Sequence, residues 1–272
     1  MESDKNNKSI GPRCGTLVIV GGDIDGVIVD EFVAAAGGSK AHIVCIPTAG
    51  GPDTTMSGFA NVLGSFGITN VTVLHTLDKI EADSEEFAAP LREADGVWFD
   101  GGRQWYLVDA YKDTLTERLI HGVLERGGVI GGTSAGATIQ GSYLARGDSG
   151  GNQKMMGDHE EGFSFLKNVA IDQHVLARNR HFDMFVILMN RPELLGIGID
   201  EKTAIVVRGD EFKVLGTSYV LVYDGSFWSR EGSKEKILPK NDNLFYFLRK
   251  GDRYDLRNRK VINAADTQDA QI

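Results

Sequence analysis

Short apolar runs alternate with helix-compatible segments along the first half of the chain, and this alternation restricts the possible folds more than any other feature. A continuous apolar run is typical of a strand that helices cover on both faces. Strands that alternate with helices predict an α/β fold, with a doubly wound, mostly parallel sheet flanked by helices and with ligand sites beyond the C-terminal strand ends. The expected strands are Thr16–Val20, His42–Ile46, Val71–Leu74, Gly96–Phe99 and the run that ends at Ile130, and the expected helices are Val27–Ala36, Met56–Phe66 and Thr114–Arg126.

The rest of the chain is richer in strand patterns and turns. Residues 141–162 are rich in glycine, aspartate and serine, which is typical of a long surface loop. The last third carries extra β-structure, with strands expected at 195–200, 204–207, 213–215 and 219–223 that extend or cap the sheet. A chain of 272 residues with this pattern predicts a single domain over residues 1–272, with a core at about 14–262 and polar termini.

Composition excludes several classes of function. The formal net charge of −9 and the lack of a basic stripe argue against binding to nucleic acid or to an anionic membrane. The two cysteines form no CxxC pair, so neither a disulfide framework nor a metal site is expected, and both thiols are expected to be buried or inert. The first twelve residues are polar and no run is long enough to cross a bilayer. These features predict a cytoplasmic protein, with an exported mature form as the alternative.

A nucleophile elbow follows the fifth expected strand. Gly132, Ser134 and Gly136 fit the pattern G-x-S-x-G, in which glycines allow a sharp strand–turn–helix and leave a serine hydroxyl exposed. The N–H group of Ala135 would lie at the N-terminus of the next helix, where it can stabilise an oxyanion. The pattern predicts Ser134 as a catalytic nucleophile. The alternative is a turn whose serine only caps the helix.

A serine hydroxyl needs a base to accept its proton, and His174 is the expected base. It follows a short strand at residues 168–173 and leads into a polar cluster, with His181 as the second candidate. The histidines at positions 42, 75 and 121 fit structural roles better, and the histidine at 159 falls in the expected loop.

The histidine in turn needs an acidic group that fixes its tautomer, and Glu201 is the expected acid. Along residues 195–201 the bulky side chains occupy odd positions, so Glu201 shares their packed side and requires a partner there. Asp172 and Asp148 are the alternative candidates for the acid. Glu201 could also have no catalytic role and simply pair with Lys202 at the end of the strand.

Two further segments carry groups that suit a substrate pocket. The loop after the strand at residues 96–99 contains Gly101, Gly102 and Gln104, and the N–H of Gly102 could supply a second oxyanion donor. Arg178 and Arg180 could bind a substrate carboxylate through paired guanidinium groups. Both arginines would share a side with the base in an extended segment, whereas only Arg178 would do so in a helix.

Four motifs in this order resemble those of the cyanophycinases, which are serine peptidases related to aspartyl dipeptidases and have a fold similar to class I glutamine amidotransferases. The resemblance spans roughly residues 16–224, and four ordered motifs are more specific than one elbow. The motifs are Phe99–Gln104, Gly132–Ala137, Asp172–His174 with Arg178–Arg180, and Gly196–Glu201. The resemblance implies the nucleophile Ser134, the base His174 and the acid Glu201, and a substrate pocket formed by Gln104, Asp172, Gln173, Arg178 and Arg180.

The resemblance also implies a reaction and a substrate. Cyanophycinases hydrolyse cyanophycin, a poly-aspartate with arginine on each β-carboxyl group, to β-Asp-Arg dipeptides, usually as homodimers and without metal or organic cofactor. One departure is Asp183, at a position where these enzymes commonly have arginine. The expected substrate is therefore a β-aspartyl or arginine- and aspartate-containing peptide. The alternatives are a related aspartyl dipeptidase, another serine amidase or esterase, and a catalytically silent protein that binds acidic peptides.

Overall fold

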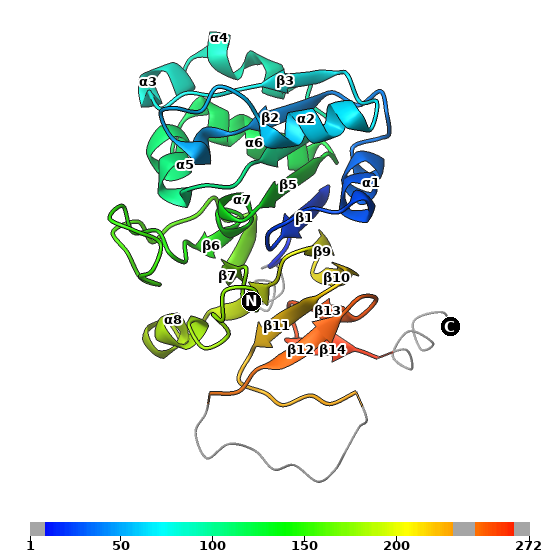
Figure 1. Cartoon of the computed structure of the whole chain (residues 1–272), viewed down its shortest axis with the longest axis vertical. Helices are drawn as coiled ribbons and strands as arrows, with labels where there is room; N and C mark the ends of the chain where they lie inside the picture. The colour runs from blue at the N-terminus through cyan, green and yellow to red at the C-terminus, as the bar shows by residue number, and fades with distance from the viewer. Residues whose placement is uncertain (1–8, 231–242, 264–272) are drawn as a thin grey trace, which may run out of the picture.

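Two β-sheets form the frame of the protein, whose computed structural model describes residues 9–230 and 243–263 (Figure 1). Within those residues the larger sheet has nine strands in the order β14-β13-β10-β9-β1-β5-β4-β2-β3, and the smaller has five in the order β12-β11-β8-β7-β6. The strands of the larger sheet are β1 (Thr16–Val20), β2 (Ile43–Ile46), β3 (Val71–Val73), β4 (Gly96–Phe99), β5 (Val129–Thr133), β9 (Thr203–Arg208), β10 (Glu211–Gly216), β13 (Arg253–Asp255) and β14 (Lys260–Ile262). Those of the smaller sheet are β6 (Gly141–Tyr143), β7 (Leu166–Gln173), β8 (Leu195–Ile199), β11 (Tyr219–Tyr223) and β12 (Tyr246–Arg249).

The first half of the chain supplies the parallel part of the larger sheet, as its alternation of strands and helices predicts. β1 pairs with β5, β5 with β4, β4 with β2 and β2 with β3, all in parallel. The last third extends this sheet through the antiparallel strands β9, β10, β13 and β14. The α/β fold with extra late β-structure is confirmed, although β11 and β12 join the smaller sheet instead of the larger one.

Helices cover both faces of the parallel strands, because side chains alternate along each strand. Val18 of β1 packs with Phe32 of α1 and Phe59 of α2. Leu17 points to the opposite face, into the cluster that includes residues of α5 and α6. The helices are α1 (Gly26–Ala35), α2 (Gly58–Ser65), α3 (Lys79–Ala82), α4 (Glu85–Ala88), α5 (Gln104–Tyr111), α6 (Leu115–Glu125), α7 (Ala135–Thr138) and α8 (Met184–Asn190), with short 3-10 turns η1 (Thr48–Gly50) and η2 (Ala89–Arg92).

The smaller sheet packs one face against the larger sheet and the other against α8. Ile197 of β8 belongs to the same hydrophobic cluster as Leu17 of β1. On the other face, Ala170 of β7 packs with Met184 of α8. The carboxyl ends of β1 and β7 meet, and a hydrogen bond of 2.8 Å joins the N–H of His174 to the carbonyl oxygen of Gly21.

Residues 141–162 differ from the surface loop that their composition predicts. They include β6, which pairs with β7, and Tyr143 forms a bridge with Glu161. The side chain of Arg146 is 1% exposed. The glycine and aspartate content conceals a short strand and a buried arginine, whose partners lie elsewhere in the chain.

Two other expectations can be compared with the structure. Cys45 is buried as expected, but Cys14 is exposed, because it lies just before β1 and not within it. Of the expected polar termini, residues 1–8 and 264–272 lie outside the described part of the chain. In that described part, no helix combines the length and the apolar character that crossing a membrane requires.

Candidate active site

The segment around Ser134 forms a sharp turn between β5 and α7. Ser134 has φ 56° and ψ −111°, a conformation that is strained for a residue with a side chain. The two glycines of the pattern are required by packing: a Cβ atom on Gly132 would overlap the carbonyl group of Gly136, and one on Gly136 would overlap that of Phe99. The local sequence therefore permits the turn that presents the serine hydroxyl at the end of β5.

The structure brings Ser134, His174 and Glu201 together at the joint between the two sheets. The Nε2 atom of His174 lies 2.9 Å from the Oγ atom of Ser134, and its Nδ1 atom lies 2.8 Å from an oxygen of Glu201. A carboxylate only accepts hydrogen bonds, so Nδ1 carries the proton and Nε2 is free to accept one from the serine. The serine follows β5 of the larger sheet, whereas the histidine follows β7 and the glutamate follows β8, both of the smaller sheet.

Gly22 leaves the space that the histidine and glutamate occupy. A Cβ atom on Gly22 would lie 2.5 Å from the Cγ atom of Glu201 and 2.6 Å from the Nδ1 atom of His174. The hydroxyl of Thr133 donates a short hydrogen bond to the carbonyl oxygen of Gly22. From the sequence alone, Gly22 looks like an ordinary turn residue after the first strand. Its role is not visible there, because His174 and Glu201, which need the space, lie far away in the chain.

The surroundings of His174 keep its imidazole neutral near pH 7. Burial lowers the pKa of His174 below its ordinary value, and the nearby positive charge of Arg178 acts in the same direction. The hydrogen bond to Glu201 opposes this effect. A histidine in this state can accept the proton of the serine at neutral pH.

The expected oxyanion donors flank the serine. Ala135 is the first residue of α7, where backbone N–H groups have no partner within the helix. On the other side, a Cβ atom on Gly101 would lie 3.3 Å from the Cβ atom of Ser134. Gly102 has φ +146°, and a Cβ atom there would overlap the carbonyl group of Ala49, so the loop needs glycine to run this close.

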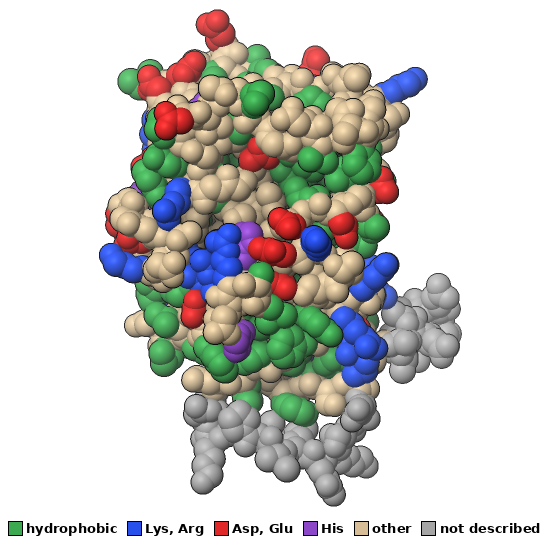
Figure 2. All heavy atoms as spheres, viewed as in Figure 1, with side chains coloured by type: hydrophobic (Ala, Val, Ile, Leu, Met, Phe, Trp, Pro, Cys, Tyr) green, Lys and Arg blue, Asp and Glu red, His purple; other side chains and the backbone are tan. Residues whose placement is uncertain are grey.

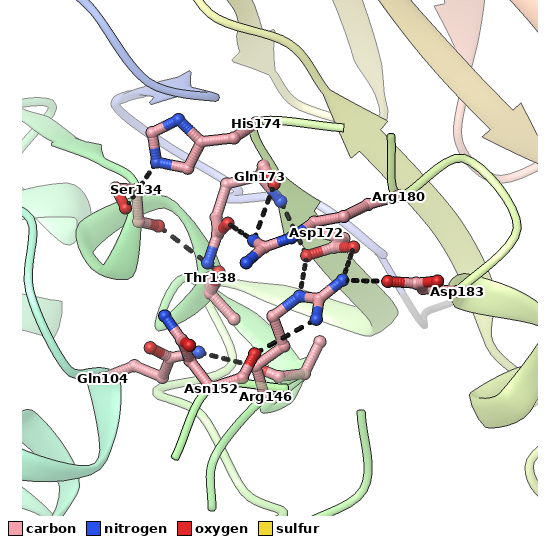
Figure 3. Close-up of polar contacts among 11 residues, drawn as sticks. Gln104, Ser134, Thr138, Arg146, Asn152, Asp172, Gln173, His174, Arg180 and Asp183 are labelled. Carbon is pink, nitrogen blue, oxygen red and sulfur yellow. Dashed lines mark hydrogen bonds and ion pairs between the residues drawn. The ribbon is translucent and has the colours of Figure 1, made fainter. Parts of the chain in front are cut away.

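Polar side chains gather on the β7 side of Ser134 (Figure 3). Gln104 is buried and donates to the carbonyl oxygen of Ala145 at 2.7 Å. Arg180 is buried and donates to the Oε1 atom of Gln173 at 2.8 Å. Figure 2 shows a histidine between a group of basic and a group of acidic side chains near the centre of this face of the molecule.

The segment after His174 is neither extended nor helical. It is a tight turn in which the N–H of Arg178 donates to the carbonyl oxygen of His174 at 2.9 Å, and Asn179 has φ 53°. Consequently Arg180 points into the protein, whereas Arg178 is exposed. The two arginines thus differ in burial, and of the two only Arg178 is open to solvent.

Arg146 is a buried residue that the sequence does not single out, and its guanidinium occupies the carboxylate of Asp172. Its guanidinium binds both oxygens of Asp172, at 2.7 and 2.9 Å, and one oxygen of Asp183, at 2.6 Å (Figure 3). A fourth hydrogen bond, of 3.1 Å, reaches the carbonyl oxygen of Asn152. Since Asp172 is 1% exposed and both of its oxygens face Arg146, it supports the pocket wall and is not open to a substrate.

His181, the second candidate for the base, and Asp148, an alternative acid, make contacts with other residues. The imidazole of His181 packs against Phe182, with ring centroids 4.4 Å apart. Asp148 pairs with Lys154 at 2.8 Å. Among the described residues, no group of three or more histidine, cysteine, aspartate or glutamate side chains is arranged to hold a metal ion.

Comparison with known proteins identifies the family. Residues 19–215, more than half of the chain, match peptidase family S51. The chain belongs to peptidase family S51. It is 31% identical over 259 residues to the cyanophycinase of Geminocystis herdmanii, with 90% of this chain and 94% of that protein covered. It is 30% identical over 263 residues to the cyanophycinase of Trichormus variabilis, with 91% and 88% covered.

These matches confirm the resemblance to cyanophycinases, and the chain is a serine-type peptidase of the hydrolase class. Among solved structures, the crystal structure of a peptidase from an acI-B1 Actinobacterium superposes with a TM-score of 0.62. That chain is 24% identical, and the alignment covers 90% of this chain and 98% of that one. This similarity shows that the two share a fold.

Asp183, which stands where cyanophycinases commonly have arginine, forms an ion pair with Arg146. Its carboxylate shares the guanidinium of Arg146 with Asp172, so three charged groups form one network (Figure 3). The sequence shows no local signal for this network, because its members lie 26 and 37 residues apart in the chain.

Proposed function

We propose that this S51 peptidase hydrolyses β-aspartyl peptides such as cyanophycin through the triad Ser134, His174 and Glu201. The observation that carries the proposal is the unbroken hydrogen-bond chain from Ser134 through His174 to Glu201, with distances of 2.9 and 2.8 Å. Such a chain activates a serine hydroxyl as a nucleophile.

The reaction proceeds through an acyl-enzyme. His174 Nε2 takes the proton as Ser134 Oγ attacks the scissile carbonyl carbon, and the N–H groups of Ala135 and Gly102 stabilise the oxyanion. The C–N bond then breaks, and His174 gives its proton to the leaving amine. Water then attacks the ester carbonyl carbon as His174 accepts a proton from it. The bond between the acyl carbon and Ser134 Oγ breaks, His174 returns the proton to Oγ, and the acid product leaves. Glu201 holds the imidazole in the required tautomer and stabilises its protonated form.

The substrate assignment is supported by the cyanophycinase relatives and by the basic groups beside the serine. Arg178 lies at the surface and Arg180 deeper in the pocket, where they can bind a substrate carboxylate. Gln104 and Gln173 add polar contacts nearby, whereas Asp172 acts through Arg146.

The test is product analysis on cyanophycin and on short α- and β-aspartyl peptides by mass spectrometry. The wild-type protein is expected to release β-Asp-Arg from cyanophycin, and Ser134→Ala to lose about 10⁴-fold or more in kcat. A phosphonate reagent should label wild-type Ser134 and leave Ser134→Ala unmodified. Hydrolysis by Ser134→Ala at the wild-type rate rules the mechanism out, and an unlabelled wild-type serine favours a binding protein without catalysis.

We also propose that the enzyme works as a homodimer. Three apolar side chains of and beside α8 are exposed, Phe182 by 60%, Val186 by 45% and Met189 by 70%, and such patches often mark interfaces. Light scattering coupled to size-exclusion chromatography is expected to give twice the chain mass, and Met189→Glu to reduce it to that of one chain. A wild-type monomer at micromolar concentration contradicts the proposal.

A further inference from the structure

A pocket of about 370 Å³ lies beside Ser134, on the side away from β7. Its lining includes Gly101 and Thr133, and a Cβ atom on Gly101 would lie 3.3 Å from the Cβ atom of Ser134. The pocket is bounded by α2 and by the loops after β1, β2 and β4. In Figure 1, α2 and β7 lie on opposite sides of β5 and α7. A substrate side chain next to the scissile bond is thus within reach of this pocket.

One carboxylate, that of Asp100, stands in the wall of the pocket. Among the described residues that form the lining, Asp100 alone is charged. Its oxygens accept hydrogen bonds from the backbone N–H groups of Gly58, at 2.8 Å, and of Phe59, at 3.4 Å. These donors and the neighbouring hydroxyl of Ser57 are uncharged, so none of them supplies a counter-charge. Each carboxylate oxygen can accept two hydrogen bonds, so Asp100 keeps acceptor positions for a donor that enters the pocket.

The environment of Asp100 favours a positive charge in the pocket. Burial raises the pKa of Asp100 above its ordinary value, whereas the hydrogen bonds from Ser57, Gly58 and Phe59 act in the opposite direction. Burial therefore disfavours the charged carboxylate, and a cation that binds beside it would offset this effect. A second carboxylate in the same place would be repelled.

The other walls suit the stem of a long side chain. Phe59 is buried and stacks on Trp98 with ring centroids 3.7 Å apart, so this wall is fixed. Val62 is half-buried one helical turn after Gly58. An arginine side chain can place its methylene groups along such a surface while its guanidinium reaches a carboxylate. We call the pocket the Asp100 subsite, and its apolar residues are Ile24, Pro47, Met56, Phe59 and Val62.

We propose that the Asp100 subsite binds the guanidinium of a substrate arginine next to the scissile bond. This inference rests on the proposed function of the site and names the residue that selects for the positive charge of the substrate. In the proposed polymer every aspartyl unit carries an arginine, so a unit beside the scissile bond offers its guanidinium to Asp100. Paired N–H donors of a guanidinium match the two oxygens of a carboxylate. Arg178, on the β7 side, is left to bind a substrate carboxylate.

The test compares kcat/KM for two synthetic oligomers. One has three β-Asp-Arg units joined through their aspartates, and the other has citrulline in place of each arginine, which keeps the shape of the side chain but removes its charge. We expect the wild-type protein to prefer the arginine oligomer by about tenfold to a hundredfold, the range that a hydrogen bond between charged partners gives. Equal kcat/KM for the two oligomers overturns the inference and leaves the triad mechanism intact.

A matched pair of variants assigns the preference to Asp100. Asp100→Asn keeps an acceptor for the N–H groups of α2 but removes the charge, so the ratio of kcat/KM between the two oligomers should fall towards one. Asp53→Asn removes the same charge at an exposed position of the loop before α2, outside the lining, and should keep the full ratio. A ratio that survives Asp100→Asn contradicts the assignment. A ratio that falls equally in Asp53→Asn also overturns it, because the preference would then be a general electrostatic attraction.

A second pair of variants tests the same pocket from α2. Val62→Lys places an ammonium group in the subsite, where it can pair with Asp100, so the preference for arginine should be lost although the carboxylate is retained. Asn61→Lys adds the same charge on the exposed side of the helix and should keep the preference. Thermal unfolding curves show that both variants are folded. A preference for arginine that survives in Val62→Lys contradicts the location of the subsite.

A binding measurement separates this inference from the proposed catalysis. In Ser134→Ala, calorimetry is expected to show tighter binding of the arginine oligomer than of the citrulline oligomer, with the difference lost when Asp100→Asn is added. If the wild-type protein hydrolyses neither oligomer but this difference is present, the peptidase proposal fails while the Asp100 subsite stands. If the two oligomers bind equally, or neither binds, the subsite assignment fails even where hydrolysis is observed.

Discussion

Three glycines make room for the proposed catalytic groups of this site. Gly132 and Gly136 let the chain turn sharply around Ser134, and Gly22 lets His174 and Glu201 approach the end of β1. The first two belong to a recognisable pattern, but Gly22 is defined only by residues about 150 positions or more further along the chain.

Gly22→Ala should therefore damage catalysis more than folding. A methyl group there would push His174 and Glu201 out of line, and a displacement of about 1 Å at a catalytic group can cost roughly a hundredfold in rate. Steady-state kinetics and a thermal unfolding curve measure the two effects. Gly64→Ala, at an open position of α2, is the control that should leave kcat unchanged. A fully active Gly22→Ala protein would show that the space is not needed.

The lowered pKa of His174 predicts the pH dependence of the reaction. The base works when it is neutral, so activity falls as pH drops through its pKa, which lies below the ordinary histidine value of 6.5. Arg178→Gln removes a positive charge that lowers this pKa, so the acidic limb of kcat/KM should move to higher pH. The matched control is Arg208→Gln, whose arginine pairs with Glu31. An unmoved limb in Arg178→Gln would contradict the electrostatic argument.

At the scale of elements, the segment after β6 ties two parts of the site together. The carbonyl group of Ala145 holds Gln104 of α5, and the side chain of Arg146 holds Asp172 at the end of β7. The strand before His174 and the helix after Gly102 are thus fastened to the same short stretch of chain.

Arg146→Met is expected to destabilise the protein strongly. It leaves Asp172 buried without its counter-charge, and breaking a buried ion pair in this way typically costs about 3–5 kcal/mol. Urea unfolding measures the loss. Adding Asp172→Asn should recover part of the stability, because the uncompensated charge is removed. Arg191→Met, which removes the partner of Glu160 in an exposed pair of the same segment, should change little. A stable Arg146→Met protein would refute the role of the network.

The sequence predicts elements well where the signal is local and poorly where partners are distant. β5, the elbow and α7 follow from a run of apolar residues and the glycines around Ser134. The burial of residues 141–162 cannot be predicted from the local sequence. Arg146 is charged, and only its contacts with the distant Asp172 and Asp183 make it an interior residue. The turn at His174 is hidden for a similar reason, since its N–H group bonds to the carbonyl oxygen of Gly21, which follows the distant strand β1.

At the scale of the whole molecule, the two sheets share one hydrophobic cluster, and the single domain expected over residues 1–272, with a core at about 14–262, stays a prediction. Leu17 of the larger sheet and Ile197 of the smaller sheet belong to this cluster, together with Val220 of β11. A core of this kind couples the folding of both sheets.

Ile197→Ala should consequently lower the stability of the whole domain. Truncation of a buried isoleucine typically costs about 2–5 kcal/mol, and the protein should still unfold in one calorimetric transition at a lower Tm. Val27→Ala, at an exposed position of α1, is the control that should leave Tm nearly unchanged. Two separate transitions, with only one of them shifted by Ile197→Ala, would indicate two domains.

The proposed nucleophile follows β5 of the larger sheet, while the proposed base follows β7 of the smaller sheet and the proposed acid lies in the turn between β8 and β9. The proposed catalysis thus depends on a rigid contact between the two sheets. A relative displacement of about an ångström there would remove the activity while the secondary structure remained intact. Heat inactivation should accordingly set in at a lower temperature than melting. Mutations that improve the packing between the two sheets should raise the temperature at which activity is lost, even though they lie outside the proposed catalytic residues.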